Sequence, residues 1–160
     1  MNAISKVIIG TLLKTNYMES RRVDFSEPIP KLIERLIGEH KDLYPKLSRI
    51  ETMSVSDSIV SLEELRPKIL HHAVEEEARI MRVIIEGISK ESATSSIQIM
   101  QEHRWVVNFL DQRLRELPKI ESNLAKLEIM KFISDLKLHF EEEEQVVFPL
   151  ALKIHSKGKP

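Results

Sequence analysis

Four of the six histidines interrupt hydrophobic stripes that have helical spacing. These four are His40, His72, His103 and His139. Two of them are followed four residues later by a glutamate, His72 by Glu76 and His139 by Glu143, and this spacing puts both side chains on one face of a helix. Four imidazoles in an apolar core would need many hydrogen-bond partners if uncharged, and would repel one another if charged. A bound metal satisfies all of them, so the pattern predicts a metal site.

The number of donors indicates two ions rather than one. Four imidazoles and two carboxylates exceed the needs of a single ion, but they suit a pair of ions that share Glu76 and Glu143 as bridges. Each ion would then hold two histidines and two bridging oxygens, with room for a solvent bridge and an exogenous ligand. This set of nitrogen and oxygen donors is compatible with iron or manganese. The chain has no cysteine, which excludes zinc ribbons, thiolate-bound clusters and thiol catalysis.

Turn signals divide residues 28–156 into four helices that must position these donors. The first follows Pro28 and Pro30 and ends before the polar run Ser54 to Ser58; the second begins near Ser58 or Ser61 and ends at Gly87; the third begins between Ser89 and Ser95 and ends at Pro118; the fourth begins at Ser122 and runs to Ile154.

The histidines occupy the same level of an antiparallel bundle. Two residues of an antiparallel hairpin lie at one height when their midpoint in the sequence falls on the connecting loop. The midpoints of the three consecutive histidine pairs fall within the run Ser54 to Ser58, beside Gly87, and between Pro118 and Ser122. All three are predicted turns, so the four imidazoles are expected to meet in one layer.

The composition agrees with a helical fold. The chain has 160 residues, of which 42% are hydrophobic and 31% charged, with only 4 Gly and 7 Pro. This predicts an all-α protein, an antiparallel up-down-up-down four-helix bundle with a short N-terminal extension. The extension, residues 1–27, has apolar residues spaced as in an amphipathic helix, although its isoleucines also permit a strand. We expect it to pack on the bundle or to form a homodimer contact.

Charge and hydropathy indicate a cytoplasmic protein without a nucleic-acid or membrane partner. Lys and Arg number 24 against 25 Asp and Glu, a net charge of -1, which gives no electrostatic reason to bind nucleic acid or an anionic membrane. The apolar stretch from Val7 to Leu13 is too short to span a bilayer.

Helical phase separates the remaining polar residues from the predicted site. It places His72 in the interior and His71 in solvent. The other glutamates of the runs Glu75 to Glu77 and Glu141 to Glu144 are interpreted as a solvated face.

Tyr44 is an additional candidate for the site. It follows His40 by four residues and is expected to face the interior, where a phenol can bind or hydrogen-bond near a ferric ion. The alternative is a core tyrosine whose hydroxyl bonds a nearby carbonyl. Trp105, two residues after His103, is expected to face away from the metal and to serve in packing.

The histidine motifs resemble those of the hemerythrin-like, HHE cation-binding family. HAVEEE from His72 and HFEEEEQVVFP from His139 resemble its paired signatures. His40 in IGEHKDL and His103 in QEHRWVV match the lone histidines of its first and third helices, and the resemblance covers Pro28 to Ile154. It implies a non-haem di-iron centre, with two Fe ions per chain joined by an oxo or hydroxo bridge, that binds dioxygen or a related small oxidant.

One position departs from the oxygen-carrying members of that family. They have a further histidine where this chain has Val107, so the ion of His103 and His139 would be one protein ligand short. Six-ligand sites of this kind resemble those of bacterial di-iron proteins that repair damaged iron centres. The functions left open are oxygen binding or sensing, redox or iron homeostasis, reduction of peroxide or nitric oxide, and iron-centre repair. The alternative from another class is a metal-free or zinc-loaded structural interaction bundle.

Overall fold

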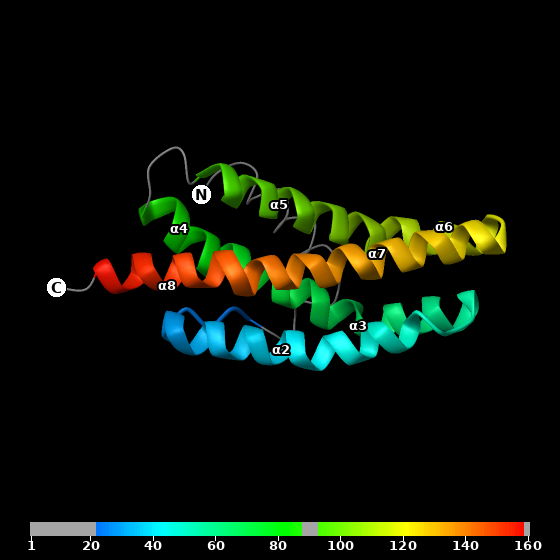
Figure 1. Cartoon of the computed structure of the whole chain (residues 1–160), viewed down its shortest axis with the longest axis horizontal. Coiled ribbons are helices and arrows are strands. Elements are labelled where there is room, and N and C mark those ends of the chain that lie inside the picture. The colour runs from blue at the N-terminus through cyan, green and yellow to red at the C-terminus, as the bar shows by residue number, and fades with distance from the viewer. Residues whose placement is uncertain (1–21, 88–92, 159–160) are drawn as a thin grey trace.

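The protein is a bundle of four antiparallel helical rods (Figure 1). The computed structural model describes residues 22–87 and 93–158, and the side chains of all of these except 93–97. Every regular element in these ranges is a helix, which confirms the predicted all-α, up-down-up-down fold. Residues 1–21, most of the predicted N-terminal extension, lie outside the described residues.

Each rod after the first is divided into consecutive helical segments. In chain order the elements are α2 (Ile29–Ile50); α3 (Val55–Glu75), η1 (Glu76–Met81) and α4 (Arg82–Gly87); α5 (Ala93–Asn108), η2 (Phe109–Arg113), α6 (Leu114–Glu116) and η3 (Leu117–Lys119); α7 (Ser122–Glu142), η4 (Glu143–Val147) and α8 (Phe148–Lys157). The segments η1, η2 and η4 are π-helical turns, and η3 is a 3-10 turn.

Capping side chains fix where two of the rods begin. The Ser54 hydroxyl accepts a hydrogen bond from the Asp57 amide at 3.2 Å, so α3 begins at Val55, a few residues before the predicted start. The Glu121 carboxylate accepts from the amides of Asn123 and Leu124 at 3.0 and 3.1 Å and caps α7. Both caps satisfy amides that have no partner within the helix.

The hydrophobic core consists of two clusters. One is formed around residues such as Leu43, Leu62, Leu110 and Phe132, and the other around residues such as Leu36, Ile80, Ile99 and Phe148. On every rod the predicted ligands stand between residues of the first cluster and residues of the second. The polar layer is therefore closed by packed apolar side chains toward both ends of the bundle.

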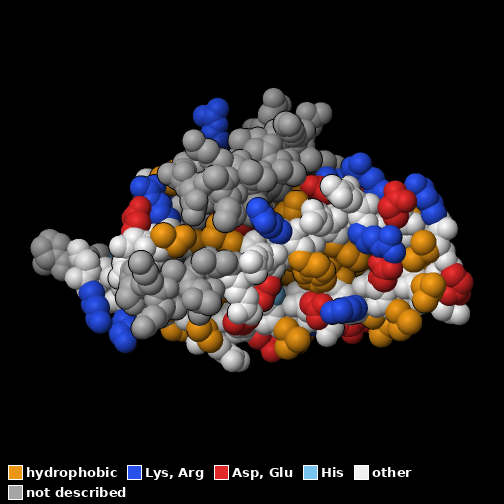
Figure 2. Space-filling model, turned by 90° about the horizontal axis from the view of Figure 1, so that it is seen from above, with side chains coloured by type: hydrophobic (Ala, Val, Ile, Leu, Met, Phe, Trp, Pro, Cys, Tyr) orange, Lys and Arg blue, Asp and Glu red, His pale blue; other side chains and the backbone are white. Residues whose placement is uncertain are grey.

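The surface carries mixed charge. On the face that Figure 2 shows, Lys and Arg side chains are interspersed with Asp and Glu and with hydrophobic side chains. Within the described ranges, none of the helices is long and apolar enough to cross a membrane.

Candidate metal centre

The structure brings the six predicted ligands together in the interior. His40 comes from α2, His72 from α3, His103 from α5 and His139 from α7, while Glu76 and Glu143 are the first residues of the π-helical turns η1 and η4. All six are buried, with exposed fractions from 0% for Glu143 to 6% for His139.

Their donor atoms form two overlapping groups that can each hold a metal ion. The first group is His40, His72, Glu76 and Glu143, and the second is Glu76, His103, His139 and Glu143. Within each group the donor atoms lie within 4.8 Å of one another. The two glutamates belong to both groups, which is the arrangement expected of a two-ion site.

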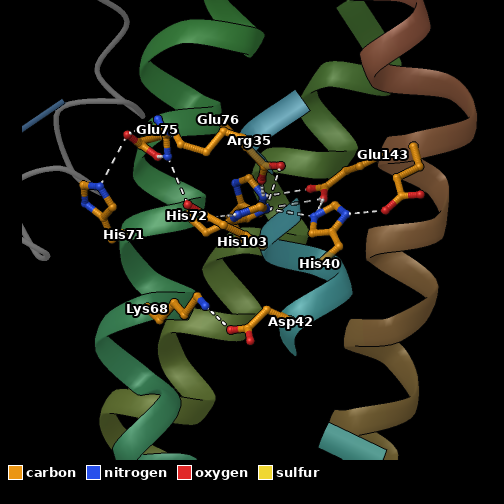
Figure 3. A network of polar contacts seen from close by, with 12 residues as sticks. Arg35, His40, Asp42, Lys68, His71, His72, Glu75, Glu76, His103 and Glu143 are labelled. Atoms are coloured by element: carbon orange, nitrogen blue, oxygen red, sulfur yellow. Dashed lines mark hydrogen bonds and ion pairs between the residues drawn. The ribbon is translucent and has the colours of Figure 1, made fainter. Parts of the chain in front are cut away.

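Each shared carboxylate directs one oxygen toward each group. Glu76 places Oε1 at 3.0 Å from Nε2 of His72 and Oε2 at 3.1 Å from Nε2 of His103. Glu143 places Oε1 at 2.6 Å from Nε2 of His139 and Oε2 at 3.2 Å from Nε2 of His40. Figure 3 shows Glu76, Glu143, His40, His72 and His103 converging on the same space between the helices.

Every imidazole presents Nε2 to the centre and Nδ1 to a second carboxylate. The Nδ1 to carboxylate distances are 2.8 Å for His40 and Glu144, 2.7 Å for His72 and Glu39, 3.1 Å for His103 and Glu77, and 2.7 Å for His139 and Glu102. A carboxylate that accepts from Nδ1–H leaves Nε2 with a lone pair and orients the ring, as is usual for histidines that bind metals.

The outer carboxylates link the rods in a ring. Glu39 of α2 bonds His72 of α3, and Glu77 of η1 bonds His103 of α5. In the same sense around the bundle, Glu102 of α5 bonds His139 of α7, and Glu144 of η4 bonds His40 of α2. Each rod therefore supplies donors to the centre and orients a donor of the next rod.

Several atoms at the centre lack a partner that a cation would provide. Nε2 of His40 and Nε2 of His72 lie 2.9 Å apart, and two lone pairs facing at this distance repel unless a proton or a metal ion lies between them. Both oxygens of Glu76 and Oε2 of Glu143 are buried and make no contact with hydrogen-bond geometry to the residues that the structure describes. Such atoms are costly in an apolar core. Their convergence fits bound cations.

In the metal-free chain the surrounding carboxylates raise the pKa values of His72 and His139, which favours positive charge at the centre. Burial alone would lower the pKa of His72, but the carboxylates of Glu76, Glu39 and Glu143 raise it to about 10. Burial also opposes the charged form of His139, and Glu143 and Glu102 raise its pKa to about 9. Protons thus occupy the imidazoles of His72 and His139 at neutral pH when no metal is bound.

The pKa of the shared carboxylate Glu143 is shifted downward, in the direction opposite to that of the histidines. Burial would raise its pKa, but His139, His103 and His40 hold the pKa well below its usual range. The carboxylate therefore stays ionised and available as a ligand at neutral pH. A centre of carboxylates and imidazoles suits cations with nitrogen and oxygen preferences.

The outer carboxylates are a correction to the sequence interpretation. Glu75 and Glu77 are 3% and 7% exposed rather than solvated, and Glu144, though more exposed, orients His40. Glu77 and Glu144 accept from Nδ1 of His103 and His40, whereas Glu75 is held by Arg35 and by Nε2 of His71. The signal in the sequence is a repeated one: a Glu directly precedes His40 and His103, and a Glu directly follows Glu76 and Glu143.

Tyr44 was predicted to face the centre, but its side chain does not do so. Its side chain is 40% exposed, and Nζ of Lys137 lies 4.8 Å from the centre of its ring. The buried stripe of α2 runs through His40, Leu43 and Leu47, and a residue four positions after His40 lies at the edge of that stripe. The phenol therefore extends outward and stacks under the Lys137 ammonium.

His71 lies outside both groups. Figure 3 shows its ring directed away from His72 and toward Glu75. The prediction that His71 lies in solvent is wrong. Its side chain is only 15% exposed, and its Nε2 lies 3.4 Å from Oε1 of Glu75.

Val107 and Trp105 have packing roles. Val107 is 6% exposed and belongs to a hydrophobic cluster, and Trp105 packs on Phe132 with ring centres 5.1 Å apart. This agrees with the expectation for Trp105.

Comparison with known proteins gives no relative: no protein-family model, no curated protein and no solved structure matches the chain. The assignment of function therefore rests on the residues and their geometry.

Proposed function

We propose that this chain is a non-haem di-iron protein that binds dioxygen or a related small oxidant. The observation that supports this most is the position of Glu76 and Glu143, each with one carboxylate oxygen toward either group of imidazoles. His40, His72, His103 and His139 would supply two nitrogen donors to each ion, and Glu76 and Glu143 would supply one oxygen each to either ion. The order of these ligands along the sequence is the one that resembles the hemerythrin-like family.

The number of donors favours iron over zinc as the functional metal. Four donors complete the tetrahedral shell that zinc prefers at structural sites, and the bundle would then be a zinc-loaded scaffold. Iron takes a larger coordination number, so the same four donors leave positions open for solvent and for an exogenous ligand. When bound, a pair of iron ions supplies the electrons needed to reduce a small oxidant.

The chain itself would hold, orient and shield the ions. Glu39, Glu77, Glu102 and Glu144 fix the imidazole rings through Nδ1. The two hydrophobic clusters limit the entry of water from the ends of the bundle. A dry, rigid set of donors protects the metal from loss and from uncontrolled reaction.

Val107 favours redox turnover or sensing over stable oxygen carriage. A valine at this place gives the ion of His103 and His139 no third imidazole. An ion with fewer protein ligands exchanges its other ligands more readily. The same property suits reduction of peroxide or nitric oxide, the second candidate function.

Stopped-flow mixing of the reduced, iron-loaded protein with dioxygen tests the proposal. We expect rapid oxidation of both ions, with an oxygen adduct that decays within seconds to minutes. Val107→His should lengthen the lifetime of that adduct, provided that the larger side chain is accommodated, a risk of about 1–3 kcal/mol. An iron-loaded protein that does not react with dioxygen, peroxide or nitric oxide would contradict the proposed function.

A further inference from the structure

The outer face of α7 carries exposed hydrophobic side chains. Leu124, Leu127 and Leu138 are 55%, 63% and 59% exposed, and Met130 on the same helix is 43% exposed. Among the residues of α2, all of which the structure describes, only Tyr44 is both large, hydrophobic and exposed. Single exposed hydrophobic residues are ordinary, but several on one helix face mark a surface that binds a partner.

The exposed residues of α7 follow a heptad spacing. Leu127, Lys131, Ser134 and Leu138 succeed one another at steps of four, three and four residues, and all four are exposed. With a turn of about 100° per residue, this spacing places them in one stripe along the outside of the helix. A stripe of this spacing is suited to pack along a second helix.

The order of side chains in this stripe is complementary to its own reverse. The midpoint of Leu127 and Leu138 in the sequence lies next to Ile133, and the midpoint of Lys131 and Asp135 is Ile133 itself. If two copies of α7 pack antiparallel about a two-fold axis at this level, Leu127 of each copy meets Leu138 of the other. Lys131 of each copy then meets Asp135 of the other, so opposite charges face each other twice. A parallel pair would instead set Lys131 against Lys131, which is repulsive.

A groove beside Leu138 fits the side chains that a second copy would bring. It lies between α5 and α7, has a volume of about 450 Å³, and is lined in part by Trp105, Leu138 and Asp135. Among the described residues that line it there is neither Lys nor Arg. In the antiparallel arrangement Leu127 of the second copy meets the apolar side chains of this groove, and Lys131 of the second copy meets its carboxylates.

The charged pair of the stripe can change partners without loss. Lys131 and Asp135 are paired within one helix, and their side chains are 73% and 37% exposed, so this pair contributes little to the stability of the single chain. Pairing across the two-fold axis keeps both charges matched, while the leucine contacts remove apolar surface from water. The leucines therefore supply the driving force, and the charges fix the register.

We propose that α7 forms an antiparallel homodimer, in which the stripe from Leu127 to Leu138 packs against the same stripe of a second copy of this chain. The interface uses one helix of each copy, so the dissociation constant should be on the order of micromolar, as for small interfaces. The proposal goes beyond the proposed function and does not depend on which metal the centre holds.

Sedimentation equilibrium of the full chain and of two charge variants tests the interface. Lys131→Asp and Asp135→Lys each set like charges opposite one another, so each should raise the dissociation constant of the homodimer by about tenfold or more. An equimolar mixture of the two variants should form a heterodimer, because each variant supplies the charge that the other lacks. Native mass spectrometry distinguishes this heterodimer from the two homodimers.

Arg82→Asp is the matched control for the charge variants. Arg82 pairs with Glu86 at an exposed site on α4, and the substitution changes the net charge by as much as Lys131→Asp does. It should leave the dissociation constant unchanged. A mixture of the two charge variants that stays monomeric would overturn the antiparallel pairing.

The contribution of the leucines is tested separately. Leu127→Gln should also weaken the dimer about tenfold or more, whereas Val60→Gln, at a residue of α3 that is 58% exposed, should not. A full chain that remains monomeric at about 1 mM would overturn the proposal. A dimer that is unaffected by Leu127→Gln and by both charge variants would also overturn it, since the contact would then lie elsewhere, as in residues 1–27.

Discussion

His71 and His72 are neighbours in the sequence, yet only His72 belongs to a group that can hold a metal ion. One step along a helix turns a side chain by more than a quarter of a turn. His72 is therefore buried beside Glu76, while His71 contacts Glu75 on another side of the rod.

Alanine substitution of these two histidines should have unequal effects. His72→Ala should lower metal affinity by about 100-fold or more, because it removes a donor and leaves Glu39 bonded to Arg35 alone. His71→Ala should retain both ions. Metal analysis after dialysis against a weak chelator measures the difference, and His72→Gln, which is similar in size, controls for misfolding. Equal metal loss in the two alanine variants would contradict the phase of this helix.

Metal affinity should rise with pH beyond the range of an ordinary histidine. The pKa of His72 is about 10 and that of His139 about 9 in the metal-free chain, so both hold protons at neutral pH. A metal must displace these protons, and the apparent affinity should increase about tenfold per pH unit for each proton released. Competition with a chelator of known affinity between pH 6 and 9 measures this. An affinity that becomes constant above pH 7 would contradict the raised pKa values.

The sequence was more informative about the inner donors than about the residues around them. The convergence of the six candidate ligands in the core could be predicted because the histidines and Glu76 and Glu143 follow the periodicity of buried stripes. Tyr44 was predicted wrongly because a residue at the edge of a stripe turns inward or outward according to its neighbours, here Lys137. Glu77 and Glu144 were missed because a run of glutamates has the same composition whether it faces solvent or an imidazole.

At the scale of the elements, Arg35 joins α2, α3 and the segment before α2. Its guanidinium donates to both oxygens of Glu75 at 2.8 Å, to Glu27 at 2.8 and 3.2 Å, and to Glu39 at 3.0 Å. Glu39 in turn accepts from His72. The packing of the first two rods is thereby connected to the orientation of His72, a candidate ligand.

This network should make the metal-free protein less stable in acid. Burial would raise the pKa of Glu75, but His71 and Arg35 lower it to about 2. A carboxylate with a lowered pKa stabilises the fold above its unfolded value near 4.5 and loses that effect as the pH falls toward 2. Glu75→Gln should therefore cost about 2 kcal/mol at pH 7, after allowance for the exposure of Arg35, and much less near pH 2.

Urea unfolding at both pH values measures this difference. Glu86→Gln is the control, since Glu86 pairs with Arg82 at an exposed site and should change stability little. A Glu75→Gln effect that is the same at pH 7 and near pH 2 would contradict the role of the ion pair.

The order of the rods could be read from the sequence, but their segmentation could not. Caps, prolines and hydrophobic period predict where a helix exists, and the four predicted rods are present. The π-helical turns η1 and η4 begin at Glu76 and Glu143, the two shared carboxylates. Such turns depend on tertiary packing around the site rather than on local propensity, and they often occur at functional positions.

At the scale of the whole molecule, the centre is built twice from one pattern. The pair α2 and α3 with η1 supplies Glu39, His40, His72, Glu76 and Glu77. The pair α5 and α7 with η4 supplies the corresponding Glu102, His103, His139, Glu143 and Glu144. This correspondence explains why two similar groups that can each hold a metal ion lie side by side, with hydrophobic clusters on either side.

Metal content and magnetic coupling of protein purified from iron-supplied cells test the di-iron assignment. We expect close to two irons per chain, with near-ultraviolet charge-transfer bands and antiferromagnetic coupling between the two ions in the Mössbauer spectrum in an applied field. One iron or less per chain after careful reconstitution, with zinc in its place, would contradict the di-iron assignment and favour a structural bundle.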